Sequence, residues 1–205
     1  LTEKEPRNFL FICSIRPIRK PVESLVPKWK GTLSNVTPIS QMLAEEKIRH
    51  RICSPSSLAM AVSRIKGLTD IEANTVWKKL ITLCYDLNIN AYGSWPKAIY
   101  AASTFGVLGG IEAHTDLKSA EKCLELGQPV VCSIDYAKGK LRGAPLASTK
   151  GHLVTLIGIE DEQILVMDPA TPEKSSIARE YDRQEFENAW LRNRGAGYYF
   201  CVTSE

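Results

Sequence analysis

The sequence predicts an α+β domain in which an N-terminal helical part is followed by an antiparallel β-sheet. Between residues 53 and 126, apolar residues recur at helical spacing in four segments, most of which end at a glycine. After residue 129, short runs rich in β-branched and aromatic residues alternate with turn residues. The change in periodicity separates the helical part from the sheet.

Length and composition fit one globular domain, since the chain has 205 residues and 44% hydrophobic content. The net charge of +3 indicates neither nucleic acid nor an acidic membrane surface as a partner. The longest apolar runs, such as Leu153–Ile159, are too short to cross a bilayer. The chain starts at Leu1 and not at Met, which indicates a trimmed or processed piece. A removed signal peptide is neither visible nor excluded.

The first 36 residues differ from the rest of the chain. Asn8–Cys13 has the pattern of a strand, and the proline-rich, basic stretch after it indicates an extended arm or linker. We therefore expect an N-terminal extension at 1–36, as the possible tail of a preceding domain, and a compact domain at 37–205.

Capping signals and glycine stops define the helices. In the first, Pro55 suits the opening turn and Gly67 supplies the stop, and in the second Thr69 and Glu72 form a capping box. The four predicted helices cover Cys53–Gly67, Thr69 to about Tyr85, Ser94–Gly106, and about Asp116–Leu126.

The sheet is expected to begin at Pro129–Asp135, after which Tyr136–Lys150 forms a basic loop. Lys150–Ala170 reads as two strands around a turn at Ile159–Ile164. A short helix should run from Asp182 to about Leu191, and Gly197–Thr203 should close the sheet.

Cys53 is the candidate nucleophile among six cysteines that form no CxxC pair and no metal-ligand spacing. It lies at a helix start, where the partial positive charge and the free N–H groups favour the thiolate. The next residues, Ser54–Pro55–Ser56, look like a small polar collar and not like packed apolar neighbours. A buried, unreactive thiol is the alternative, and the even number of cysteines permits disulfides without indicating them.

His152 and Asp168 are the candidate partners of that thiol. If the turn lies at Ile159–Ile164, both residues fall at the same open end of a two-stranded ladder. A carboxylate there can hold an imidazole in one tautomer and stabilise its charged form. A capping histidine beside a turn aspartate is the structural alternative.

Five blocks, in order, resemble a known family of papain-like cysteine peptidases, the bacteriocin-processing enzymes that cleave after a double glycine. The similarity is greatest to its broad bacterial "family 39-like" branch and covers about Val36 to Val202. The blocks are Thr37–Gln41, Cys53–Val62, Gly93–Val107, Leu126–Ile134 and the hairpin Gly151–Ala170.

The resemblance implies a papain-like fold and a role for four residues. Cys53 matches the nucleophile, His152 the general base and later acid, and Asp168 the residue that orients the imidazole. Gln41 matches the side-chain donor of the oxyanion hole, which acts with the backbone N–H of Cys53. Gln41 lies twelve residues before Cys53, a longer gap than in the bacteriocin-processing relatives, so the segment between them must loop out.

The resemblance further implies a peptide or protein substrate, with no cofactor and no metal. It slightly favours a location at the cell envelope or outside the cytoplasm. Two other functions stay open: amide hydrolysis or acyl transfer on a non-protein substrate, and an inactive binding module that keeps the fold. Neither the substrate specificity nor the oligomeric state follows from the sequence.

Several other residues receive structural interpretations. We expect Trp95 to anchor packing, and His50 and His114 to be surface or structural residues. The basic residues before His152 should form a solvated loop, and the alternative is that they form a rim that faces the substrate. They are Lys138, Lys140, Arg142 and Lys150.

Overall fold

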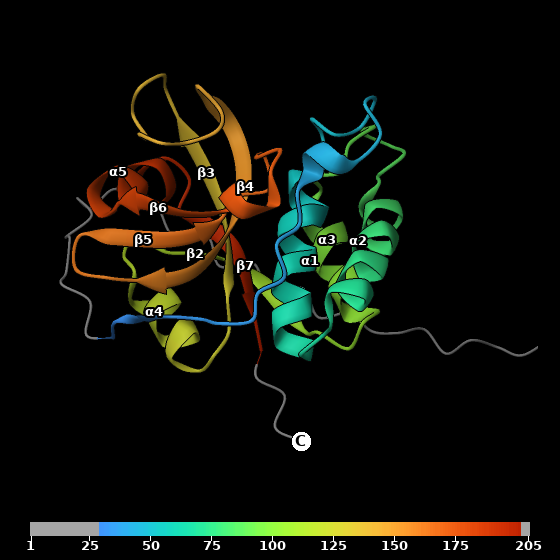
Figure 1. The fold of residues 1–205 in the computed structure, drawn as a ribbon, viewed down its shortest axis with the longest axis horizontal. Coiled ribbons are helices and arrows are strands. Elements are labelled where there is room, and N and C mark those ends of the chain that lie inside the picture. Colours follow the sequence, from blue (N-terminus) through green and yellow to red (C-terminus); the bar gives the residue numbers. More distant parts are fainter. Residues whose placement is uncertain (1–28, 202–205) are drawn as a thin grey trace, which may run out of the picture.

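The computed structural model describes residues 29–201, which form a helical half and a sheet half (Figure 1). The helical half contains α1 (Cys53–Lys66), α2 (Asp70–Cys84) and α3 (Trp95–Ser103). The sheet half carries α4 (Lys118–Glu125) and α5 (Arg183–Glu187). The predicted α+β class is confirmed.

A seven-stranded antiparallel sheet forms the second half, in the order β2-β7-β3-β4-β5-β6 with β1 also paired to β4. The strands are β1 (Gly31–Thr32), β2 (Gly109–Ala113), β3 (Val130–Tyr136), β4 (Thr149–Ile159), β5 (Gln163–Met167), β6 (Ala178–Asp182) and β7 (Ala196–Phe200). The remaining short elements are η1 (Gln41–Leu43), η2 (Lys174–Ser176) and the π-helical turn η3 (Asn188–Arg192).

The predicted helix ends agree with the observed caps. Gly67 ends α1 in the left-handed conformation, at φ 62°, which glycine adopts without a steric penalty. Thr69 and Glu72 form the expected capping box of α2. Asp182 accepts a hydrogen bond from the backbone N–H of Glu185 at 2.9 Å and so caps α5.

The order of helices and strands needs one correction, because strands also occur within and before the helical part. β2 lies between α3 and α4 in the chain, and β6 lies where no strand was predicted. Both lack a readable apolar alternation, since β2 is glycine-rich and β6 (AREYD) buries only Tyr181.

The N-terminal boundary near residue 36 stays a prediction. β1 and the backbone N–H of Leu33 pair with β4, so contacts with the sheet include residues that precede Val36. The predicted strand at Asn8–Cys13 lies outside the described residues.

Candidate active site

Cys53 is the first residue of α1 and is half-buried. Burial by itself would raise the pKa of its thiol. A hydrogen bond to His152, the charge of that imidazole, and backbone N–H groups of Leu153 and Ser54 outweigh burial, so the pKa lies below its ordinary value. The thiol is therefore set in surroundings that favour the thiolate.

The serines after Cys53 are buried, so the small polar collar predicted at Ser54–Pro55–Ser56 is tightly packed. Ser57 Oγ donates to the carbonyl of Leu153 at 2.7 Å, and Thr155 Oγ1 donates to the carbonyl of Ser57 at 2.9 Å. Trp77 Nε1 donates to Ser56 Oγ at 2.9 Å. These buried hydrogen bonds fix α1 against β4 and α2, and so fix the thiol relative to His152.

His152 lies on β4 and is buried. Its Nε2 is 2.8 Å from Asp168 Oδ1, which leaves the other ring nitrogen for the hydrogen bond to Cys53. Burial alone would lower the pKa of this imidazole. The charge of Asp168 and the hydrogen bonds to Asp168 and Cys53 raise it to about 10. The charged imidazolium is therefore the stable form beside a thiolate.

Asp168 directly follows β5 and is fully buried. Its Oδ1 also accepts the backbone N–H of Ala170 at 3.0 Å, and its Oδ2 accepts the hydroxyl of Tyr181 at 2.9 Å. Burial would raise the pKa of the carboxyl, but the charge of His152 and these hydrogen bonds hold it below the ordinary value. Tyr181 had not been singled out from the sequence, because a tyrosine in a charged segment carries no signal for this contact.

Gln41 is buried next to the Asp168 turn. Its backbone N–H donates to the carbonyl of Pro169 at 2.9 Å, and its Nε2 donates to the carbonyl of Arg49 at 2.6 Å. The long segment between Gln41 and Cys53 thus folds back over the glutamine as a series of turns. Gln41 Oε1 is buried and has no hydrogen-bond partner among the described residues.

A pocket adjoins the thiol between the two halves of the molecule, and we call it the thiol pocket. Trp95 packs against the core, as expected, and also lines this pocket; His50 lines it as well. The lining residues are His50, Arg51, Cys53, Ala91, Tyr92, Gly93 and Trp95 from the helical half, and Ser133, Gly151, Leu153 and Arg194 from the sheet half.

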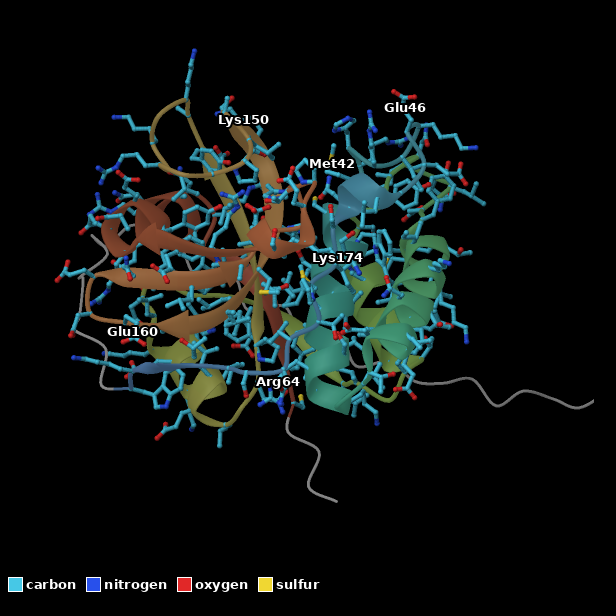
Figure 2. All side chains as sticks on the ribbon, in the orientation of Figure 1. Met42, Glu46, Arg64, Lys150, Glu160 and Lys174 are labelled. Carbon is cyan, nitrogen blue, oxygen red and sulfur yellow. The ribbon has the colours of Figure 1, made fainter. Side chains whose placement is uncertain are left out.

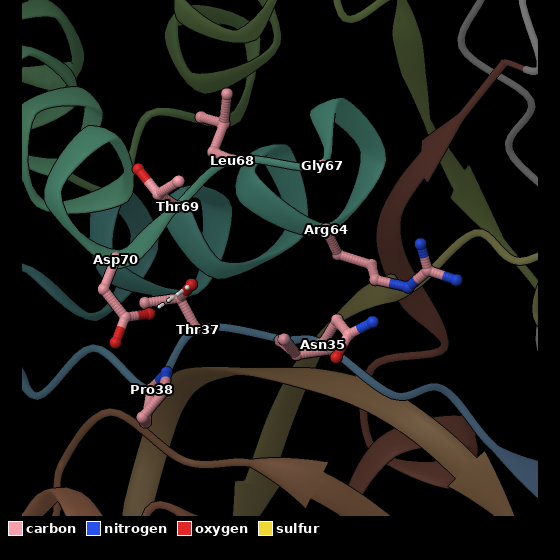
Figure 3. Close-up of a pocket in the computed structure, with 9 residues that line it drawn as sticks. Asn35, Thr37, Pro38, Arg64, Gly67, Leu68, Thr69 and Asp70 are labelled. Atoms are coloured by element: carbon pink, nitrogen blue, oxygen red, sulfur yellow. Dashed lines mark hydrogen bonds between the residues drawn. The ribbon is translucent and has the colours of Figure 1, made fainter.

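A second pocket lies at the other end of α1, between Asn35–Pro38 and the α1–α2 turn (Figure 3). Thr37 Oγ1 donates to Asp70 at 3.0 Å across its wall, and Arg64 also lines it. Figure 2 shows Arg64 at the opposite end of the molecule from Lys150, the residue two before His152. This second pocket is therefore separate from the thiol.

The basic loop is partly tied to the protein. Arg142 Nε donates to Glu185 Oε1 at 2.5 Å, and Lys150 lies 3.8 Å from Asp135. His114 contacts Glu112 at 2.7 Å and Ser119 at 3.2 Å, in line with a structural role. Within residues 29–201, no three His, Cys, Asp or Glu side chains are grouped so that they could hold a metal ion. No helix in that range combines the length and apolar character needed to cross a membrane.

The chain belongs to the Peptidase_C39-like family, whose model matches residues 33–198. This confirms the family resemblance read from the sequence blocks. No curated protein matches the chain significantly.

Solved structures confirm that the fold is that of C39-like peptidases. A candidate C39-like peptidase from Bacillus anthracis has a TM-score of 0.62 at 20% identity, over 87% of this chain and 100% of that one. A double glycine motif protease from an AMS/PCAT transporter, in complex with its leader peptide, has a TM-score of 0.54 at 17% identity, over 86% and 98%. The peptidase domain of Streptococcus ComA, a bifunctional ABC transporter, has a TM-score of 0.52 at 14% identity, over 82% and 100%.

Proposed function

We propose that the protein is a cysteine peptidase that uses Cys53, His152 and Asp168 as a catalytic triad. The observation that carries the proposal is the position of His152 between the two other residues: its Nε2 lies 2.8 Å from Asp168 Oδ1, and its charge and proximity lower the pKa of the half-buried Cys53 thiol. A leader peptide occupies one structural relative, which supports a peptide as the substrate class.

The chemistry follows from the two charge states. The Cys53 thiolate attacks the substrate carbonyl carbon and forms a C–S bond, while the carbonyl electron pair moves to oxygen. The intermediate collapses, the C–N bond breaks, and the His152 imidazolium gives its proton to the leaving amine. His152 then takes a proton from water as the water oxygen attacks the thioester carbonyl, the C–S bond breaks, and the thiolate and imidazolium are restored. Asp168 stays ionised and orients the ring throughout.

Gln41 is proposed as the side-chain donor to the oxyanion, together with the backbone N–H of Cys53. The amide nitrogen carries two hydrogens, and the contact with Arg49 uses one of them. The backbone bond to Pro169 supports this role, because it holds Gln41 beside the residue that follows Asp168.

A library of proteome-derived peptides tests the proposal. We expect the protein to generate new peptide termini, and a sample with Cys53 alkylated beforehand to generate none. Termini that carry one ¹⁸O atom from labelled water identify hydrolysis. Transfer of the acyl group to added amines without hydrolysis would favour an acyltransferase. Efficient Cys53 alkylation with no turnover of any peptide, amide or ester would favour a binding module.

The pH dependence of alkylation checks the ion pair. Since the pKa of Cys53 is lowered, the thiolate persists below the ordinary range for thiols and disappears only as the pH falls through this lowered value. Iodoacetamide should therefore label Cys53 readily at about pH 6. Burial raises the pKa of Cys84 to about 12 and that of Cys123 to about 11, so these thiols should stay unlabelled. Peptide mapping by mass spectrometry measures each site.

His152→Ala should move the Cys53 labelling curve to higher pH, because it removes the charge and hydrogen bond that stabilise the thiolate. An unmoved curve would show that the two residues do not act as a pair.

Tyr181 is proposed as a positioning residue that acts through Asp168. Tyr181→Phe should remove one of the bonds that hold the carboxylate, leaving a buried oxygen without that partner at a cost of about 1–3 kcal/mol. The pKa of Asp168 should rise toward its ordinary value, and the acid limb of the activity profile should move to higher pH with it. Urea unfolding and pH-rate profiles measure the two effects.

Tyr199→Phe is the matched control, because the Tyr199 hydroxyl is buried without a hydrogen-bond partner in the described part of the chain. It should leave the pH profile in place. An equal shift in both variants would rule out a specific role for Tyr181.

A further inference from the structure

We propose that the thiol pocket binds a carboxylate of the substrate, so that the enzyme prefers peptides with an acidic group close to the scissile bond. This inference rests on the proposed peptidase function and adds a substrate class to it. Two arginines, Arg51 from the helical half and Arg194 from the sheet half, line the pocket that adjoins Cys53. None of the lining residues is an aspartate or a glutamate.

Arg51 is held in place by neutral partners. Its guanidinium carbon lies 5.6 Å from the centre of the Tyr92 ring, and its Nη2 donates to Asn90 Oδ1 at 3.1 Å and to the Asn90 carbonyl. Tyr92 is packed against Tyr85 at 4.9 Å between ring centres. These contacts order the side chain but leave its charge uncompensated, since it forms no ion pair with any carboxylate of residues 29–201.

Arg194 lies against the backbone that precedes the candidate base. Its guanidinium donates to the carbonyl of Lys150, and a Cβ atom at Gly151 would come within 2.7 Å of its Nη2. Glycine at position 151 thus leaves room for the guanidinium next to His152. Arg194 Nε is buried without a hydrogen-bond partner in the described structure, and no carboxylate there pairs with this side chain.

The nearby acids are already engaged elsewhere. Asp168 is bonded to His152, and Asp135 lies 3.8 Å from Lys150. Two arginines line this pocket with no aspartate or glutamate, and the Cys53 thiolate there is already paired with His152, so the arginines create a positive potential that favours binding of an anion. A guanidinium binds a carboxylate through a pair of N–H donors, so a carboxylate is the group on a peptide that fits this pocket. Tyr92 and Trp95 also line the pocket and provide an apolar surface for the hydrocarbon part of an acidic side chain.

Alkylation of Cys53 by two reagents of similar size tests this inference without a substrate. Iodoacetate carries a carboxylate, whereas iodoacetamide is neutral, so the ratio of their rate constants at Cys53 measures the preference for an anion. Arg51→Gln and Arg194→Gln should each lower this ratio by about twofold to thirtyfold, which is the effect of one charge at a separation of about 8 Å between water-like and protein-like screening. Arg194→Lys should keep most of the ratio.

Arg192→Gln is the matched control, because Arg192 is exposed, lies two residues from Arg194, and does not line the pocket. It should leave the ratio unchanged. Thermal unfolding of each variant identifies any loss of fold. If Arg194→Gln unfolds, Arg51→Gln still tests the inference, because Arg51 is exposed and its replacement should leave the fold intact. A ratio that stays constant in folded Arg51→Gln overturns the inference.

Cleaved peptides then identify the source of the carboxylate. We expect a Glu-to-Gln change near the scissile bond to lower kcat/KM in the native protein, and the loss to shrink in Arg51→Gln and Arg194→Gln. If only a change from a free C-terminus to an amide has this effect, the pocket binds a terminal carboxylate. Cleavage with no acidic preference overturns the inference and leaves the peptidase proposal standing, whereas absent cleavage of every peptide overturns the peptidase proposal itself.

Discussion

Cys53→Ala should abolish hydrolysis while the protein keeps its fold. Removing the nucleophile of a triad lowers the turnover rate by about three to six orders of magnitude. The fold should survive because Cys53 is half-buried at the start of α1, and the contacts that fix this helix come from Ser56, Ser57 and Thr155. Initial rates on a cleaved library peptide, with circular dichroism and thermal unfolding, measure both parts.

Cys84→Ala is the matched control for this variant. Cys84 is a buried thiol with a pKa raised to about 12, so its loss should lower stability through a small packing defect but spare the chemistry. Full activity in purified, folded Cys53→Ala would remove Cys53 from the mechanism.

Asp168→Ala should lower kcat by about a thousandfold or more, because the imidazole loses both its orientation and the charge that stabilises its protonated form. It also leaves Tyr181 and the Ala170 N–H without their shared acceptor in a buried site. We therefore expect a lower free energy of unfolding as well.

Asp168→Asn should be the milder change, with a loss of about tenfold to hundredfold. The amide oxygen can still accept from His152 Nε2, while the amide nitrogen faces Tyr181, whose hydroxyl can turn to accept a hydrogen bond. Steady-state kinetics of the two variants provides the comparison. An alanine variant as active as the asparagine variant would show that the orienting bond is unnecessary.

The features that could be predicted from sequence are those set by local signals. Pro55 and Gly67 indicate the start and the end of helix α1, and the capping box indicates the start of α2. The β4–β5 hairpin follows from two apolar runs, and its last residue pair, Ile159 with Ile164, lies at the predicted turn. That register is what brings His152 and Asp168 to one end of the ladder.

The features that escaped prediction depend on contacts between distant residues. Strand β6 has a charged sequence, yet it pairs with β5 along its whole length. This pairing places the Tyr181 hydroxyl within hydrogen-bond distance of Asp168. The burial of the collar serines could not be read from the sequence, because the partners of Ser54 and Ser56 are Tyr198 and Trp77, which lie far from them in the chain. No sequence pattern indicates a role for Arg194, because only the fold places it next to Gly151.

Capture of a thioester on Cys53 tests the central claim most directly. An activated ester of a cleaved peptide should acylate the protein faster than water removes the acyl group, so the adduct accumulates. After an acid quench, mass spectrometry should find the acyl mass on the Cys53 peptide alone, and hydroxylamine should release it. Turnover of the ester with Cys53 unmodified, or an adduct on another residue that forms equally well in Cys53→Ala, would contradict the proposed nucleophile.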